Sequence, residues 1–255
     1  MSTAVADRCP TLAPAVPTAT CPGHAVCVRP DAQPQLSLAA KRLQAGAAIV
    51  APAGDLRLSY RLTKRVLDIA GALALLVVLG PAMLVVLLAL LVTTRGRPFY
   101  VQRRAGYLGR PFSMLKFRTM RLDADRLQHL VQNEVGGPVF KNRRDPRITR
   151  IGRFLRKTSL DETPQLFNVL LGSMSLVGPR PLPLSEVARF EPWHRQRMAV
   201  MPGLTCLWQI SGRSEIGFEN WVRMDLWYVR HQGLWTDLKL LFSTPWSVIS
   251  GRGAY

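Results

Sequence analysis

Acidic residues and cysteine are scarce in this sequence. It has 16 Asp and Glu against 34 Lys and Arg, which gives a formal net charge of +18 in 255 residues. Such an excess calls for an anionic partner, which would be nucleic acid, a membrane surface or a phosphorylated substrate. The 4 cysteines are too few for a disulfide framework in a chain of this length, and a reduced, cytosolic setting is the simpler interpretation.

Periodic hydrophobic patterns are missing from residues 1–58, which are rich in Ala, Pro, Thr and Val. The segment lacks a charged start followed by a long apolar run, so it does not resemble a signal peptide. Cys21, His24 and Cys27 have a spacing like that of metal ligands, but no helix or strand pattern supports them, and we assign no zinc site. We predict a flexible tail for residues 1–58 and one domain for residues 59–255.

Charge is absent from residues 69–92, a run of twenty-four residues. A helix of that length can cross a bilayer. However, Gly80 and Pro81 lie at its centre, where proline kinks a helix, and basic residues flank both ends, which favours the cytoplasmic side for each of them. The pattern predicts a re-entrant helix over about residues 66–92 that enters the membrane, bends at Gly80-Pro81 and returns. An ordinary kinked transmembrane helix is the alternative.

The sequence pattern of the remaining part, residues 98–255, predicts an α+β fold that is mostly helical. Segments 99–102 and 112–117 read as strands of a hairpin, with Gly106, Gly109 and Pro111 in the turn. We expect helices at 122–135, 164–171, 186–200, 218–230 and 235–249, the last interrupted at Pro245, and a short strand over 204–210.

An acidic pair, Asp161 and Glu162, follows a strongly basic stretch. The eight cations at positions 141–157 are opposed there only by Asp145. Nearby positive charge lowers a carboxyl pKa, so both carboxylates should be ionised at neutral pH. Such a pair suits a metal ion or attack on phosphorus. The alternative is structural: Thr163 and Pro164 look like the N-cap and first position of a helix, and carboxylates are favoured near a helix N-terminus.

Basic residues in two other places suit phosphate oxygens or lipid headgroups. Arginines recur every three residues from position 144 to position 156, with apolar residues between them, which indicates a basic amphipathic segment at an anionic membrane surface. On the predicted hairpin, Lys116 and Arg118 alternate with Leu115 and Phe117. This places the two cations on one strand edge, where a solvated face is the alternative interpretation.

From Lys64 onward the sequence resembles a known family, the bacterial polyprenyl-phosphate sugar-phosphate transferases. These are monotopic phosphoglycosyl transferases, and the chain is most similar to their exopolysaccharide "sugar transferase" branch. The resemblance covers roughly 190 residues, and its main motifs are Lys64-Arg65-x-x-Asp68, Gln102-x-Arg104-x-Gly106, Lys116-Phe-Arg-Thr-Met120, Arg147-Ile-Thr-Arg150, Ser159-Leu-Asp-Glu-x-Pro-Gln-Leu166, Met174-Ser-Leu-Val-Gly-Pro-Arg-Pro181, Pro202-Gly-Leu-Thr205 and Ser211-Gly-Arg213. Two departures are Ser173, where the family commonly has Asp, and Cys206, where it often has Gly.

The resemblance implies an enzyme of the bacterial inner (cytoplasmic) membrane, with its active site on the cytoplasmic face. It would transfer a sugar-1-phosphate from a UDP-sugar, UDP-glucose or UDP-galactose by its branch, to undecaprenyl phosphate, with release of UMP. Asp161 would be the nucleophile and a ligand of Mg²⁺, and Glu162 its partner. Arg156, Arg180 and Arg213 match positions near the phosphates, and Lys116 and Arg118 are further candidate substrate-binding residues.

Two other classes of function compete with this one. A membrane-tethered nucleic-acid binder would explain the charge, but it leaves Asp161 and Glu162 without a role. A non-catalytic scaffold for polysaccharide assembly would be favoured by a changed Asp161 or Arg180, and both are present. We therefore expect a catalyst whose partners are a UDP-sugar, a lipid phosphate and the membrane, and not a nucleic acid.

Overall fold

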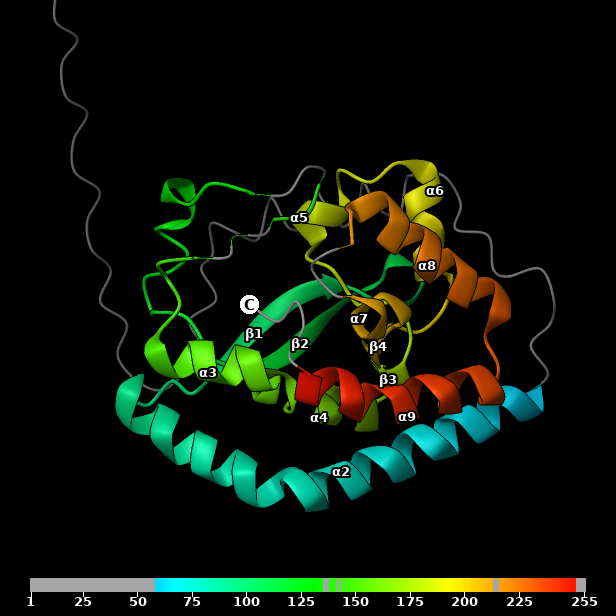
Figure 1. The fold of residues 1–255 in the computed structure, drawn as a ribbon, viewed down its shortest axis with the longest axis horizontal. Coiled ribbons are helices and arrows are strands. Elements are labelled where there is room, and N and C mark those ends of the chain that lie inside the picture. The colour runs from blue at the N-terminus through cyan, green and yellow to red at the C-terminus, as the bar shows by residue number, and fades with distance from the viewer. Residues whose placement is uncertain (1–57, 135–137, 141, 143, 213–215, 251–255) are drawn as a thin grey trace, which may run out of the picture.

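The computed structural model describes residues 58–134, 138–140, 142, 144–212 and 216–250. The predicted tail therefore lies outside the described residues, except for its last residue, Leu58. A long bent helix runs along one side of the molecule, and the other elements gather on its concave side (Figure 1).

This helix, α2, spans Leu58–Thr93 and contains Pro81. The bend in Figure 1 lies near the middle of α2 and points away from the rest of the molecule. Proline has no N–H to donate and its ring crowds the preceding turn, which accounts for the bend. The helix begins earlier than the predicted residue 66, because its polar first turns bind other elements: Lys64 Nζ lies 2.8 Å from the Asp237 carboxylate, and Tyr60 donates to the same group.

Most of the apolar surface of α2 is not covered by protein. Its most hydrophobic 18-residue window has a mean hydropathy of 3.0 and is only 6% buried, so its length and composition suit a membrane helix. The two ends nevertheless contact the same body. Near the start, Asp68 accepts from Leu176 N at 2.9 Å, and near the end Leu90 packs with Phe117 and Leu155.

The predicted hairpin is confirmed and is slightly longer than expected. Strand β1 (Phe99–Ala105) pairs antiparallel with β2 (Pro111–Phe117), with Gln102 opposite Met114. The turn between the strands includes Leu108 and Gly109, both with positive φ. Lys116 lies next to the last residue of β2, Phe117, which packs with Leu90 of α2.

A second sheet has two short parallel strands, β3 (Ser175–Val177) and β4 (Gly203–Thr205). Two glycines allow a very close approach beside it, because a Cβ on Gly203 would lie 2.0 Å from Gly178 N. The prediction of a strand within 204–210 is right only at its start. From Leu207 to Ser211 the chain forms helix α7, whose start is closed by a hydrogen bond from Cys206 N to the Gln209 side chain.

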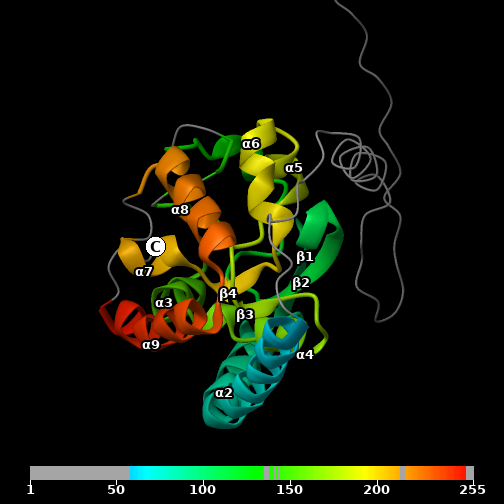
Figure 2. The ribbon, with the colours of Figure 1, turned by 90° about the vertical axis from the view of Figure 1, so that its right-hand side faces the viewer.

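Further helices cover much of the remaining described chain. α4 and β3 lie against α2, and α9 contacts the first turns of α2 through Asp237 (Figures 1 and 2). Their bounds are Arg150–Thr158 for α3, Gln165–Leu170 for α4, Leu184–Val187 for α5, Pro192–Arg195 for α6, Phe218–His231 for α8 and Leu234–Ser250 for α9. Short 3₁₀ turns occupy Gln128–Leu130, Leu160–Glu162 and Gln196–Ala199.

Three predicted helices differ from those observed. Residues 122–134 form turns and one 3₁₀ turn, because they fold around the buried Arg147, which donates to the Ala124 carbonyl and to Gln128. The segment 186–200 is divided at Pro192 into short pieces, since the residue before a proline is extended. Conversely, α9 continues through Pro245 without interruption.

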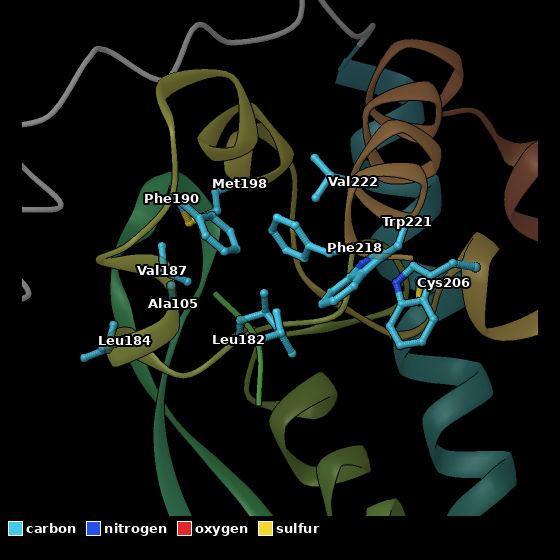
Figure 3. Packing of buried hydrophobic residues seen from close by; sticks show 12 residues of the cluster. Ala105, Leu182, Leu184, Val187, Phe190, Met198, Cys206, Phe218, Trp221 and Val222 are labelled. Carbon is cyan, nitrogen blue, oxygen red and sulfur yellow. The ribbon is translucent and has the colours of Figure 1, made fainter. Parts of the chain in front are cut away.

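The hydrophobic core has two main parts. One contains aromatic rings in tilted and edge-to-face contact, with Phe218 touching both Phe190 and Trp221 (Figure 3). The other joins α4, β3 and α9 to Ala72 of α2. Trp208 and Trp221 are core residues, whereas Trp235 and Trp246 of α9 are 69% and 76% exposed, so the tryptophans divide between packing and surface.

Candidate active site

A sharp turn between α3 and α4 carries the acidic pair. Ser159 ends α3 in the left-handed conformation, with φ of 58°, and Asp161 and Glu162 follow in the 3₁₀ turn. Within the described chain, neither carboxylate accepts a hydrogen bond from a helix N–H group, and the Thr163 hydroxyl donates to the Leu160 carbonyl instead of capping α4. The pair therefore does not cap α4 through hydrogen bonds and Thr163 is not its N-cap, although both carboxylates do precede the N-terminus of α4.

Glu162 has its charge matched by two cations. Lys116 Nζ lies 3.1 Å from Oε1, and Arg180 Nη1 lies 2.9 Å from Oε2, while Arg180 Nη2 also binds Oε1. Burial alone would raise the pKa of Glu162, but Arg180 and then Lys116 hold it well below its ordinary value. Glu162 is thus a permanent anion that fixes both cations by charge-assisted bonds.

Asp161 has a different environment. Its side chain is buried, and within the part of the chain that the structure describes no hydrogen-bond donor contacts its carboxylate. Burial and then the charge of Glu162 raise the pKa of Asp161 to about 6, while Lys116, Arg156 and Arg180 act in the opposite direction. The site therefore holds a carboxylate that is surrounded by cations and still has free lone pairs.

Arg156 reaches this carboxylate region from α3. Its Nε donates to Thr119 Oγ1 at 3.1 Å, and burial lowers the pKa of Arg156 while the charge of Asp161 opposes that change. The approach of α3 to the end of the hairpin depends on Gly152, because a Cβ there would lie 1.9 Å from the Thr119 carbonyl oxygen. A small residue in α3 thus sets the position of the arginine one turn later.

The predicted substrate-binding residues separate into three groups. Lys116, Arg156 and Arg180 are brought together around the pair. Arg118 is not, because β2 ends at Phe117 and its guanidinium turns back to the carbonyls of Arg97 and Phe99, at 2.9 Å each. Arg213 lies outside the described residues.

Two further arginines belong to the surroundings of the site. Arg104 of β1 donates to the Pro181 carbonyl, and Arg197 donates to the Arg180 carbonyl at 2.8 Å. Burial and then the nearby Arg180 lower the pKa of Arg104 to about 10. The motif Gln102-x-Arg104-x-Gly106 pointed to the first of them, whereas Arg197 stood in a predicted helix without a distinguishing signal.

The donor set limits which metal the site would take. Within the described residues, no group of three or more His, Cys, Asp and Glu side chains could hold a metal ion. Lys116 and Arg180 occupy Glu162, so Asp161 is the carboxylate with lone pairs to offer. This fits Mg²⁺, which is commonly bound by one or two carboxylates together with substrate phosphates and water.

Comparisons with known proteins show which sequences this chain resembles. A family model described as bacterial sugar transferase matches residues 59–251. The UDP-galactose-lipid carrier transferase of Erwinia amylovora is 43% identical over 206 residues, which cover 77% of this chain and 42% of that protein. The undecaprenyl-phosphate galactose phosphotransferase of Salmonella typhimurium is 42% identical over 207 residues, covering 77% of this chain and 42% of that protein.

A shorter relative is matched over nearly its whole length. The exopolysaccharide production protein ExoY of Sinorhizobium fredii is 38% identical over 208 residues, which cover 79% of this chain and 92% of that protein. Of the first two relatives, in contrast, the chain spans about two fifths of the length, 42% in each case. The family model and these relatives establish that the chain belongs to the bacterial sugar transferase family.

Proposed function

We propose that the chain is a phosphoglycosyl transferase that moves a hexose-1-phosphate from a UDP-sugar to undecaprenyl phosphate and releases UMP. One observation carries this proposal: the Asp161 carboxylate is buried among cations and free of hydrogen bonds within the described residues, beside a Glu162 that binds those cations. A buried, unpaired carboxylate among cations suits attack on an anionic phosphorus centre. The names of two relatives, which mention UDP-galactose, galactose and undecaprenyl phosphate, support the two substrates.

The reaction follows from this arrangement in two steps. An Asp161 oxygen attacks the β-phosphorus of the donor, the new O–P bond forms, and the bond to the bridging oxygen breaks, so UMP leaves with the electron pair. An oxygen of the lipid phosphate then attacks the same phosphorus and expels the Asp161 carboxylate. Splitting one displacement into two allows a single set of cations to serve both the donor and the acceptor.

The other residues have positioning and electrostatic roles. Arg156, Lys116 and Arg180 surround Asp161 with positive charge, which stabilises the phosphoryl oxygens as negative charge shifts during transfer. Glu162 keeps Lys116 and Arg180 in place and prevents them from pairing with Asp161. Mg²⁺, when bound through Asp161 and the donor phosphates, would supply further neutralisation of charge.

The membrane has a specific role in this proposal, because the acceptor phosphate is attached to a lipid. We propose that α2 enters the cytoplasmic leaflet of the inner membrane, bends at Gly80 and Pro81, and returns. Support comes from its uncovered apolar surface and from contacts at both ends with one body. On α9, Trp235, Phe242 and Trp246 are each at least 69% exposed, which suits an amphipathic helix at the interface.

A donor panel would test the activity. The full chain in lipid nanodiscs would be incubated with undecaprenyl phosphate, Mg²⁺ and either UDP-glucose or UDP-galactose labelled at the β-phosphate and the sugar. We expect release of UMP and a labelled lipid product. In the absence of the acceptor, the label should remain on a peptide that contains Asp161 and should be removed by hydroxylamine, as an acyl phosphate would be.

The same experiment separates the proposal from its rivals. A nucleic-acid binder or a scaffold would release no UMP with any donor. The affinity of a nucleic-acid binder for its nucleic acid would also fall steeply as the salt concentration rises. Label on another residue, or full turnover by Asp161→Asn, would contradict the assignment of the nucleophile even if the enzyme is active. Transfer to lipid without UMP release would contradict the reaction itself.

A further inference from the structure

A buried ion pair, Arg197 with Asp225, contacts the backbone of Arg180. Arg197 Nε and Nη2 lie 2.8 and 2.6 Å from the same oxygen of Asp225, and Trp221 Nε1 donates to that oxygen at 3.0 Å. Arg197 is 3% exposed and Asp225 is 1% exposed. The proposed reaction makes no direct use of this pair, although burying two charges is unfavourable unless the geometry has some other value.

The Arg197 nitrogen Nη2, which binds Asp225, also contacts the loop that carries Arg180. Its Nη2 donates to the main-chain carbonyl of Arg180 at 2.8 Å, and Arg104 donates to the next carbonyl, that of Pro181. On the other side, Gly203 N donates to the Pro179 carbonyl at 3.0 Å. The loop formed by Pro179, Arg180 and Pro181 has two prolines, which have no N–H. The loop is therefore positioned mainly through its carbonyl oxygens.

We propose that the Arg197–Asp225 pair is a positioning device that sets the backbone of Arg180 and thereby aims its guanidinium at Glu162 and at the donor phosphates. This inference rests on the proposed function. Asp225 holds the guanidinium plane of Arg197, and Trp221 holds Asp225. The chain of contacts continues from the Arg180 carbonyl through its side chain to Glu162, and Glu162 in turn binds Lys116.

Arginine is required at position 197 for a geometric reason. The planar fork of a guanidinium can bind a carboxylate and a carbonyl at fixed relative directions, whereas a lysine ammonium is a flexible point charge. Arg197→Lys therefore keeps the charge and allows an ion pair with Asp225, but it removes the fixed bridge to Arg180. Asp225→Asn is a more disruptive change, because it leaves Arg197 buried without its counter-charge.

A matched control is available elsewhere in the fold. Arg147 and Asp145 form another buried pair, with side chains that are each 4% exposed and with contacts from both Nε and Nη2 to the carboxylate. Arg147→Lys thus makes the same chemical change in a pair that does not contact the Arg180 loop. Any general consequence of weakening a buried arginine–aspartate pair should occur in both variants.

The first test is a double-variant cycle with sugar-phosphate transfer as the readout. We expect Arg197→Lys to lower kcat by about tenfold to a hundredfold, as a small misplacement of a charged group does, with little change in KM for the lipid acceptor. In an Arg180→Ala background the same change should lower kcat less than about twofold, because the guanidinium that the Arg197 contact positions is gone, although the main-chain carbonyl remains. Equal losses in both backgrounds would overturn the inference.

The second test does not depend on activity. Arg197 and Glu162 have no direct contact, so a merely structural role for the pair predicts that Arg197→Lys and Glu162→Gln lower Tm additively. Positioning through Arg180 predicts that the double variant loses clearly less Tm than the sum of the two single losses. In the control cycle, Arg147→Lys and Glu162→Gln should lower Tm additively. Additive losses in both cycles would refute the positioning role, and an inactive wild type with a non-additive cycle would refute only the proposed reaction.

Discussion

Asp161 and Glu162 are adjacent in the chain, yet only Glu162 is held by Lys116 and Arg180. Their pKa values move in opposite directions as a result, that of Glu162 downward and that of Asp161 upward to about 6. Titratable neighbours whose environments separate their pKa values in this way have distinct chemical roles. In the proposed reaction, Glu162, whose oxygens accept from the cations, therefore has a supporting role, and Asp161 remains available to react.

The first prediction concerns the nucleophile. Asp161→Asn keeps the shape of the side chain but removes its charge, so transfer should fall to background, a barrier increase of several kcal/mol. Because burial raises the pKa of Asp161 above its unfolded value, its ionisation above pH 6 destabilises the fold. At pH 7.5 the variant should therefore be as stable as the wild type or more stable, by up to roughly 3 kcal/mol. Thermal unfolding and UMP release measure the two effects.

Glu162→Gln should behave in the opposite way. It leaves Lys116 and Arg180 without their shared counter-charge, so we expect it to lose roughly 3 kcal/mol of stability. Turnover should be slowed but not abolished, because the attacking group remains. A stable and inactive Glu162→Gln beside a destabilised and active Asp161→Asn would reverse our assignment of the two roles.

The second prediction concerns pH. The profile of kcat/KM reports the free enzyme, so its acidic limb should lie near 6, where Asp161 ionises and becomes reactive. Burial lowers the pKa of Lys116 to about 8, against the influence of Glu162, so loss of its charge should give an alkaline limb near 8. Arg156→Gln removes a cation that lowers the pKa of Asp161, so the acidic limb should move to higher pH. An acidic limb that does not move would show that another group titrates there.

The local elements that follow from sequence pattern were predicted well, because their signals are local. The hairpin follows from its alternation and its turn glycines, and α8 matches its predicted range to within one residue at its end. The predicted helix at 122–135 failed because the turn around Arg147 is decided by a buried ion pair with Asp145. Contacts between residues distant in sequence override helix propensity there, and no local pattern records them.

The residues that form the candidate site were predicted from the sequence, but the contacts between them were not. The sequence motifs named Lys116, Arg156 and Arg180 as neighbours of the acidic pair. They did not indicate that Glu162 alone would be paired, since that depends on how β2 and the loop after β3 converge. Arg118 was misplaced because the strand alternation stops one residue before it.

The third prediction concerns the N-terminal boundary. Removal of residues 1–57 should leave transfer largely unchanged, because α2 begins at Leu58 and the known contacts of its first turns begin with Tyr60. Removal of residues 1–64 should instead lower Tm and activity, since Lys64 binds both Asp237 and the Val177 carbonyl. Transfer assays and thermal unfolding in nanodiscs measure both truncations. Loss of activity from the shorter truncation in a folded, inserted protein would show that the tail has a role.

The last prediction concerns the path of α2 through the membrane. Single cysteines would replace Arg61 and Arg97, which lie on opposite sides of the apolar run and are both exposed. The background would be a variant in which Cys9, Cys21 and Cys27 are changed to Ser, while the buried Cys206 remains. We expect a membrane-impermeant thiol reagent to label both positions in inverted vesicles and neither in intact spheroplasts. Labelling of one of them from the outside would mean that α2 crosses the bilayer.

Pro81→Leu is the matched test of the cause. The side of the helix at Gly80 is open, because a Cβ added there would meet no neighbouring atom of the described chain within 4 Å, so packing does not impose the bend. If the missing N–H of Pro81 and its ring are responsible, the leucine variant restores the helical hydrogen bond and straightens α2. A straight helix of this length spans the bilayer. The cysteine at position 97 should then be labelled from outside. Transfer should also be lost, because the start of α2 can no longer contact Asp237 while its end contacts Leu155.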